Sequence, residues 1–442
     1  MRRIESVPIT SLKIVPCPPF HGIKSPRLCE RVRNATVRMN ASKLKFAVFA
    51  YLAGMVAIHA AMFWNVRGSI RKGYSDFSIY YCAGTMLRQG LGHQLYDDSA
   101  QFKIQREFSP QVAIRFGALP YNHPPFEAAL FVPLTYVPYP VAFALWDLVN
   151  MAMLVALPFL LRPYLGHLQN CSWPLWVLAS LGFFPIFIAL LQGQDAILLL
   201  CLYVLAFVCL KQNRDIFAGG WLALGLFKPH VVLPFVLLLL VQGRKKILYG
   251  FLPAAAVLAL VSVAIVGRET ILHYPEYVLH LENTMARGAI VPSNMPNLRG
   301  VLNLIPGGNH GVGMLGPVLS MSVFLFAAWQ CRVAPSKDLF NLKFCLAMVA
   351  SILVSYHLLS YDLSMLMLPL LLLSNELVIQ RNLRTWPRAL IITSVSILLF
   401  SPGLILLMRN NRLAVAGLAV LLLLGGIAGQ ISLLAQGTRE AV

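Results

Sequence analysis

Residues 73–98 read GYSDFSIYYCAGTMLRQGLGHQLYDD, a polar and aromatic stretch that follows directly after the first long apolar segment of the chain. Asp76 is the acid of this stretch nearest to that segment, and it stands between Tyr74 and Phe77. A carboxylate there is close enough to a bilayer to meet a lipid-borne group, yet it lies outside the hydrocarbon that would neutralise it. The alternative interpretation is an interfacial loop in which Asp76 or Ser75 caps a helix starting at Phe77.

Composition identifies the class of protein. Of 442 residues, 58% are hydrophobic and only 12% are charged, which predicts an all-α, polytopic transmembrane protein. The net charge of +19 comes from basic residues in short runs between apolar segments, a pattern typical of cytoplasmic loops rather than of a nucleic-acid site. The eight cysteines form no CxxC and no metal-binding spacing.

The sequence predicts three parts. Residues 1–45 carry ten Lys and Arg against two Glu and lack a signal-peptide apolar core, so we expect a disordered basic cytoplasmic tail, with Met39 as an alternative start. Residues 46–375 form the main transmembrane module. Residues 376–442 form a C-terminal cytoplasmic loop and two accessory spans.

Charge and length set the expected topology. The first span covers 46–65, and its heavier N-terminal charge puts the N-terminus inside and Asp76 outside. The segment 124–137 is short, contains three prolines and Glu127, and is expected to lie in or dip into the membrane. With that choice the later basic clusters, including 211–214, fall inside, and about twelve crossings result. Single crossings are expected at about 174–191 and 389–407, among others.

Several polar segments then share the outer side. Segments 216–227 and 231–242 are about twelve residues each, too short to span, and predict a hairpin of short helices with Lys228 at its outer apex. We expect one outer site, assembled from this apex and three further segments: 73–123, 267–313 and 356–362.

Seven stretches in order resemble glycosyltransferase family 87, of the GT-C superfamily: GYSDFSIYYCAG, GHQLYD, YNHPPFEAALFVPL, LLQGQDAILLL, AGGWLALGLFKPHVVLPFVLLLL, NMPNLRGVLN and YHLLSYDLSMLMLPL. Each motif alone is weak, but their order and spacing over roughly residues 45–375 are specific. His123 and Asp195 depart from the usual residues at their positions, which puts the sugar and the acceptor in doubt more than the reaction type.

The resemblance implies a polyprenyl-phosphate-sugar-dependent transferase of GT-C type whose catalytic carboxylate lies early in the first outer loop, where Asp76 matches. Nucleotide sugars are absent outside the cytoplasm, so an outer-face enzyme needs a donor that the membrane delivers. We expect a multi-pass protein of the cell (inner) membrane that moves a hexose, with mannose as the family precedent, to an extracytoplasmic lipid or glycan acceptor.

In the expected mechanism Asp76 is the general base and the anomeric configuration inverts. No cofactor is expected and metal dependence is not indicated, because no nucleotide motif and no pair of acids at DxD spacing occurs, although Asp97-Asp98 could bind a cation. His357 is the second catalytic candidate, either contacting the phosphate or orienting the acceptor, with a structural donor as the alternative.

The remaining candidates are expected to bind substrate. Lys228 would hold the donor phosphate, against the alternative of a lysine that reaches out to the outer headgroups. Asp362 could equally cap the helix that it begins. The tyrosines could stack on sugar rings or anchor the membrane interface. The full set is Lys228, Arg299, Tyr80, Tyr81, Tyr121, His123, Asn297 and Asp362.

Two functions from other classes stay open. A transporter or flippase of a lipid-linked or small anionic substrate also builds sites from short broken helices, although the two halves of this chain show no matched pair of them. The other is a lipid-binding or assembly protein without chemistry.

Overall fold

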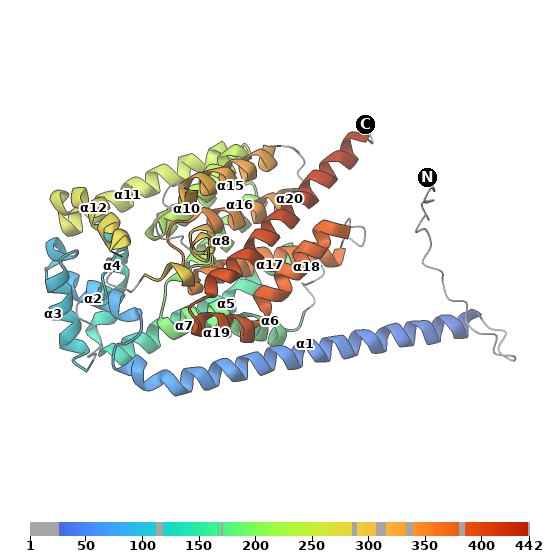
Figure 1. Cartoon of the computed structure of the whole chain (residues 1–442), viewed down its shortest axis with the longest axis horizontal. Helices are drawn as coiled ribbons and strands as arrows, with labels where there is room; N and C mark the ends of the chain where they lie inside the picture. The colour runs from blue at the N-terminus through green and yellow to red at the C-terminus, as the bar shows by residue number, and fades with distance from the viewer. Residues whose placement is uncertain are drawn as a thin grey trace. The chain divides into compact units, whose positions relative to one another are not determined.

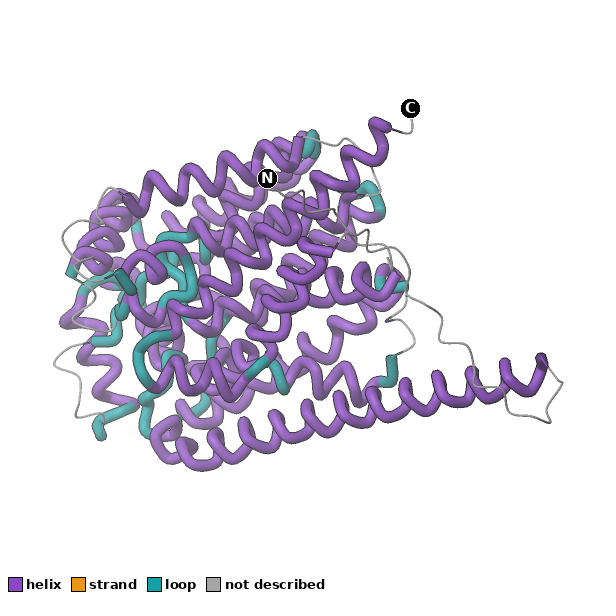
Figure 2. Tube along the Cα trace, turned by 45° about the vertical axis from the view of Figure 1, so that its right-hand side comes forward, coloured by secondary structure: helices purple, strands orange, loops and turns teal. Residues whose placement is uncertain are grey.

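Apolar helices make up most of the computed structural model, which describes residues 26–111, 118–166, 168, 171–284, 290–305, 315–332, 339–379 and 385–440. These residues form helices and loops and contain no strand (Figure 2). The predicted all-α class is confirmed.

The elements in chain order are as follows. The first half contains α1 (Pro26–Arg71), α2 (Phe77–Arg88), α3 (Asp98–Phe108), α4 (Pro125–Phe131), η2 (Val132–Tyr136), α5 (Tyr139–Leu161), α6 (Trp173–Leu181), α7 (Phe184–Gln192), α8 (Ala196–Lys211), α9 (Asp215–Leu224) and η5 (Gly225–Phe227). The second half contains α10 (Pro229–Val241), α11 (Leu248–Val266), α12 (Arg268–Asn283), α13 (Leu298–Asn303), α15 (Leu315–Arg332), α16 (Phe340–Val354), η10 (Ser360–Leu366), α17 (Met367–Ile379), α18 (Thr385–Leu399), α19 (Ser401–Arg409) and α20 (Ala416–Glu440).

The chain divides into two units, Met1–Tyr51 and Leu52–Val442, with the boundary inside α1. The first 25 residues of the predicted basic tail lie outside the described residues, and from Pro26 onward the chain is helical. The three-part division expected from the sequence stays a prediction. The cavity and the elements that position it belong to the second unit.

By length and composition, four helices among the described residues are able to cross a membrane: Lys45–Arg71, Tyr139–Tyr164, Lys245–Val266 and Leu413–Gln436. The number rises to six if two bent pairs each count as one span. Shorter apolar helices are Ala196–Lys211, Asp215–Phe227, Pro229–Val241 and Phe340–Val354. The polytopic membrane class is confirmed, whereas the count of about twelve crossings stays a prediction.

Two segments expected to be single crossings are broken. The helices α6 and α7 meet at an angle of 68°, and α18 and α19 meet at 64°. Proline stands near the start of each second helix, at Pro185 and Pro402. Proline has no backbone N–H and its ring clashes with the preceding turn, so neither helix continues straight through it.

The hairpin expected around Lys228 is present, because Asp215 at the start of α9 lies 3.1 Å from Arg244, just beyond the end of α10. The helices α9 and α10 have 10 and 13 residues and are separated by η5 and Lys228. Pro229 opens α10, where its missing N–H costs no intrahelical hydrogen bond. The break therefore places Lys228 at a point where the chain changes direction.

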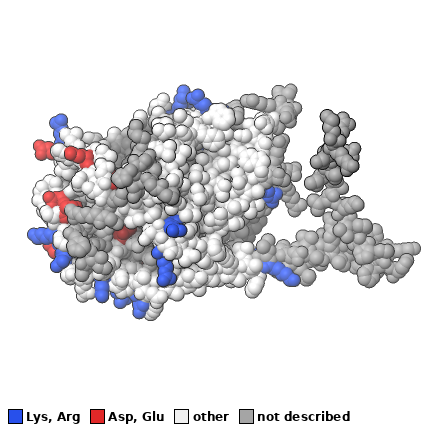
Figure 3. Space-filling model, viewed as in Figure 1, with Lys and Arg blue, Asp and Glu red and all other residues white. Residues whose placement is uncertain are grey.

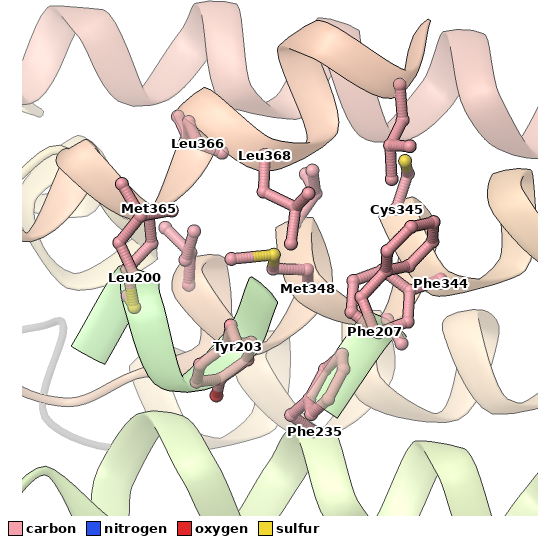
Figure 4. Packing of buried hydrophobic residues seen from close by; sticks show 14 of the residues in the cluster. Leu200, Tyr203, Phe207, Phe235, Phe344, Cys345, Met348, Met365, Leu366 and Leu368 are labelled. Carbon is pink, nitrogen blue, oxygen red and sulfur yellow. The ribbon is translucent and has the colours of Figure 1, made fainter. Parts of the chain in front are cut away.

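The largest apolar core packs α8 and α10 against α16, η10 and α17 (Figure 4). The ring centroids of Tyr203 and Phe235 lie 4.7 Å apart, and those of Phe207 and Phe344 lie 5.1 Å apart. Lipid tails are as apolar as these side chains, so such helices associate through close van der Waals contact. This core supports the segments that carry Lys228 and Asp362.

Shorter and more polar elements gather at one end of this unit, where α2, α3, α4 and α12 lie close together (Figure 1). On the visible face, acidic side chains concentrate at that end, while most of the remaining described surface is uncharged (Figure 3). The segment predicted to lie in or dip into the membrane forms α4 and η2, which have 7 and 5 residues. Neither is among the candidate spans.

Asp97 has a structural role at this end. Its side chain accepts a hydrogen bond from the backbone N–H of Ala100 at 2.8 Å and so caps α3. The Ala100 N–H and the Ser99 hydroxyl lower the pKa of Asp97, with the Ser99 bond the larger cause. One of the two acids considered for a cation is thus engaged as a helix cap.

The predicted topology is tested by cysteine labelling. Single cysteines at the exposed positions Gly90 and Thr284, in a background without native cysteines, should react with an impermeant reagent added outside. Cysteines at the exposed positions Arg214 and Lys245 should react only after permeabilisation. Labelling of position 214 from outside would mean that the segment 124–137 crosses the membrane after all.

Candidate functional site

A cavity of about 170 Å³ lies among these polar segments. Five of the residues predicted from the sequence line it: Asp76, His123, Lys228, His357 and Asp362. Gln194, His230 and Glu282 complete its polar lining together with Asn122 and two tyrosines. The five residues come from segments far apart in the sequence, so folding brings them to one cavity.

Asp76 precedes α2, but its side chain makes no capping hydrogen bond. Its Oδ2 instead accepts a hydrogen bond from Nε2 of Gln194 at 2.8 Å. The Oε1 of Gln194 accepts from the hydroxyl of Tyr80 at 2.6 Å, which orients the amide so that its NH₂ group faces Asp76. The backbone N–H of Asp76 donates to Oε1 of Gln192 at 3.1 Å. Two glutamines therefore hold Asp76 from both its backbone and its side chain.

Gly193 lies between these glutamines and makes their arrangement possible. Its φ of 62° is in the left-handed region that side chains disfavour. A Cβ atom at this position would lie 2.7 Å from Cβ of Phe77 and 2.9 Å from the ring of Phe143. The backbone after α7 therefore approaches α2 as closely as it does only because residue 193 has no side chain.

Lys228 is buried, with 4% of its surface exposed. Its Nζ lies 2.6 Å from Oδ1 of Asp195 and donates to Oδ1 of Asp362 at 2.5 Å. Oδ2 of Asp362 accepts the backbone N–H of Leu359 at 2.8 Å, just ahead of η10. Lys228 is thus the counter-ion of two carboxylates and does not extend toward headgroups, while Asp362 serves both the ion pair and the helix start.

A second charged cluster lies beside this one. Nδ1 of His123 is 2.8 Å from Oε2 of Glu127 and 3.6 Å from Oδ2 of Asp195. Burial raises the pKa of Glu127, an effect that His123 opposes and Asp195 reinforces. Burial lowers the pKa of His123, but the neighbouring Glu127 and Asp195 carboxylates outweigh it, so the net shift is upward. Asp195 therefore belongs to both clusters.

Glu282 joins α12 to the turn that carries His357. Its Oε1 lies 2.6 Å from Nδ1 of His357, and its Oε2 accepts from Arg299 at 2.5 Å. Burial alone would raise the pKa of Glu282, but the His357 and Arg299 contacts outweigh it and lower the pKa. Arg299 also stacks on Tyr356, with 4.1 Å from its guanidinium carbon to the ring centroid.

Residues 121–355 match the profile of glycosyltransferase family 87. The chain belongs to this family. A polyprenol-phosphate-mannose-dependent alpha-(1-2)-phosphatidylinositol pentamannoside mannosyltransferase from Mycobacterium tuberculosis (strain CDC 1551 / Oshkosh) is 25% identical over 219 residues, 48% of this chain. The match spans about half of that relative, 49% of its length. No solved structure matches the chain.

This family 87 chain also has helices of the length and composition needed to cross a membrane. The family match includes His123, Asp195, Lys228 and Glu282. Asp76 and the turn with His357 and Asp362 lie outside residues 121–355, although they line the same cavity.

Five predicted residues do not line the cavity: Arg299, Tyr80, Tyr81, Tyr121 and Asn297. Arg299 lies behind Glu282, and Tyr80 behind Gln194. The hydroxyls of Tyr81 and Tyr121 each donate to a backbone carbonyl at 2.9 Å. Asn297 caps α13 through the N–H of Gly300 and donates to the carbonyl of Ser355. Arg299 and Tyr80 therefore hold residues that line the cavity, whereas the other three side chains stabilise the local backbone.

The polar residues in or beside the cavity that were not predicted to act there include Gln194, Asp195, Glu127, Glu282 and His230. The first two interrupt an apolar run in LLQGQDAILLL, and Glu127 interrupts FEAALF. Polar residues within apolar runs are a recognisable signal of a functional or paired site. Glu282 stands in a polar segment, where a further acid carries no such signal.

Replacing Lys228 with Met tests the double ion pair. The variant keeps the aliphatic stem but leaves Asp195 and Asp362 without their counter-ion, so we expect a loss of stability of about 3–5 kcal/mol. Thermal unfolding in detergent measures it, and Lys228→Met with Asp362→Asn should recover part of the loss. Unchanged unfolding of the single variant would show that the carboxylates do not depend on Lys228.

The lowered pKa of Glu282 predicts that the stability of the folded protein depends on pH. Because its pKa in the folded protein is lowered, its contacts contribute stability above the unfolded pKa and lose it as the pH falls through the folded pKa. Wild type should therefore be more stable than Glu282→Gln at neutral pH, and the difference should shrink in acid. Unfolding curves of both proteins between neutral and acidic pH measure it, and a constant difference would contradict the ionic role.

Proposed function

We propose that this glycosyltransferase moves a hexose, with mannose as the first candidate, from a polyprenyl-phosphate sugar to an extracytoplasmic lipid or glycan acceptor. The name of the mycobacterial relative supports the donor and the sugar. The apolar helices support a donor delivered by the membrane. In this proposal residues 46–375 form the catalytic module, residues 376–442 are accessory, and the site faces the outside of the inner membrane.

The position of Asp76 is the observation that gives the proposal its main support. This residue lines the cavity, and the amide of Gln194 fixes its carboxylate without protonating it. A general base must be held within hydrogen-bonding reach of the hydroxyl that it deprotonates, and a carboxylate positioned at a cavity wall meets that requirement. The side chain makes no hydrogen bond that caps α2, which favours the role in the cavity over the structural alternative.

The proposed reaction is a single displacement. The acceptor hydroxyl oxygen attacks the anomeric carbon, its proton passes to Asp76, and the bond from that carbon to the phosphate oxygen breaks. The electron pair leaves with the polyprenyl phosphate, and the configuration at the anomeric carbon inverts. One base is sufficient for this route, whereas retention through a covalent intermediate needs a second carboxylate as nucleophile.

The leaving phosphate needs hydrogen-bond donors or positive charge. Lys228 and three histidines, His123, His230 and His357, line the cavity and are the candidates. Two carboxylates engage Lys228, so a phosphate contact would use the remaining N–H of its ammonium. Glu282 holds Nδ1 of His357, so phosphate would contact Nε2 of that ring. Arg299 would act indirectly, by holding Glu282.

Asp76→Asn tests the base. Asn keeps the size and the contact with the Gln194 region but does not accept the proton, so sugar transfer should fall about 10²- to 10⁴-fold. Turnover is measured in proteoliposomes with a labelled polyprenyl-phosphate mannose and a membrane acceptor extract. Donor binding and the amount of folded protein should stay at the wild-type level.

The exposed acid Glu269 supplies the control, since Glu269→Gln should transfer as wild type does. Near-wild-type transfer by Asp76→Asn would remove Asp76 from the mechanism. Uptake of the donor into vesicles without transfer, in wild type, would instead favour a transporter and overturn the proposed function.

A further inference from the structure

The carboxylates around the cavity outnumber the cations near them. Asp195, Asp362 and Glu127 are buried within one connected cluster, and Lys228 is the lysine that pairs with the first two. A buried carboxylate is costly unless a cation, a metal ion or a proton compensates it. His123 is the remaining basic group in contact, with its Nδ1 2.8 Å from Oε2 of Glu127.

Three groups in this cluster have the arrangement of metal ligands. His123, Glu127 and Asp195 each offer one ligand atom, and these atoms all lie within 4.8 Å of one another. Glu127 and Asp195 are 2% and 0% exposed. Among the residues that the structure describes, Oε1 of Glu127 has no hydrogen-bond partner despite this burial. In a native protein such an oxygen is explained by a bound ion, an ordered water or a proton.

The contacts of Asp195 are consistent with a ligand role. Its Oδ1 faces the ammonium of Lys228 at 2.6 Å, while its Oδ2 faces His123 at 3.6 Å. One oxygen is thus held by an outer partner and the other is directed into the group of three. Carboxylate ligands in metal sites are commonly oriented by such an outer hydrogen bond or ion pair.

We propose that His123, Glu127 and Asp195 bind one divalent cation behind the wall of the cavity. One imidazole nitrogen with two carboxylate oxygens suits Mn²⁺ or Zn²⁺ better than a purely oxygen-seeking ion. The cation would compensate Glu127 and Asp195 and hold the ring of His123 at the cavity wall. This departs from the expectation of no metal, which rested on the lack of a spacing motif.

A consequence for the reaction rests on the proposed function. If the donor carries a phosphate, that anion enters a cavity also lined by Asp76, Glu282 and Asp362. A divalent cation beside the wall reduces the repulsion that these carboxylates exert on it. Cation binding itself requires no donor, so it is measured separately from sugar transfer.

The experiment titrates Mn²⁺ into the full-length protein in non-ionic detergent, after removal of metals with a chelator, without donor or acceptor. Electron paramagnetic resonance should show one bound Mn²⁺ per chain with hyperfine coupling to a histidine nitrogen. Glu127→Gln keeps the shape of the side chain but removes a charged ligand. It should weaken binding by about tenfold or more, because loss of an outer partner alone already costs about 10- to 100-fold.

An exposed histidine–carboxylate pair supplies the matched control. His273 and Glu276 lie 3.5 Å apart with side chains 78% and 84% exposed, so Glu276→Gln should leave Mn²⁺ binding unchanged. No bound Mn²⁺ in wild type, or binding without nitrogen coupling, would overturn the proposal and assign a shared proton to the acids. Equal affinity of wild type and Glu127→Gln would overturn it too. The presence or absence of nitrogen-coupled Mn²⁺ in the wild-type protein tests the proposal even if a variant fails to fold.

Discussion

The ion pair of Lys228 with Asp195 and Asp362 is the constraint on which the rest of the site depends. Lys228 and Asp362 are 134 residues apart, and the ammonium is buried where a lone charge would be expensive. The break between α9 and α10, the start of α8 and the turn before α17 must therefore come together in one arrangement. Lys228 and Asp362 both line the cavity, so this pairing fixes part of its wall.

The lengths of the apolar runs and the positions of the prolines are the sequence signals that made part of the fold predictable. The short helices on either side of Lys228 follow from two brief apolar runs and Pro229, a local signal that the structure reproduces. The break between α6 and α7 was missed, because residues 174–191 form one uninterrupted apolar run of nearly full span length. Pro185 was the available signal, but a proline within such a run is also compatible with a kinked span.

The sequence predicted the residues of the site that stand at the ends of apolar segments, but not their partners. Asp76, Lys228, His357 and Asp362 were found because each stands at the end of an apolar segment, where a polar side chain is conspicuous. Their partners were not found, since the contact of Asp76 with Gln194 joins residues 118 positions apart and leaves no spacing pattern. The tyrosines were predicted to bind sugar because the sequence alone does not distinguish an aromatic side chain that faces a cavity from one that packs against a neighbouring helix.

Gly193 shows that the site depends on backbone geometry as well as on its functional groups. It contributes no functional group, yet its backbone joins the glutamines that hold Asp76 to the acid that holds Lys228, in a space already filled by Phe77 and Phe143. A genetic screen that scores only the product would mark Gly193 as strongly as Asp76. The amount of folded protein in the membrane is what tells these two kinds of loss apart.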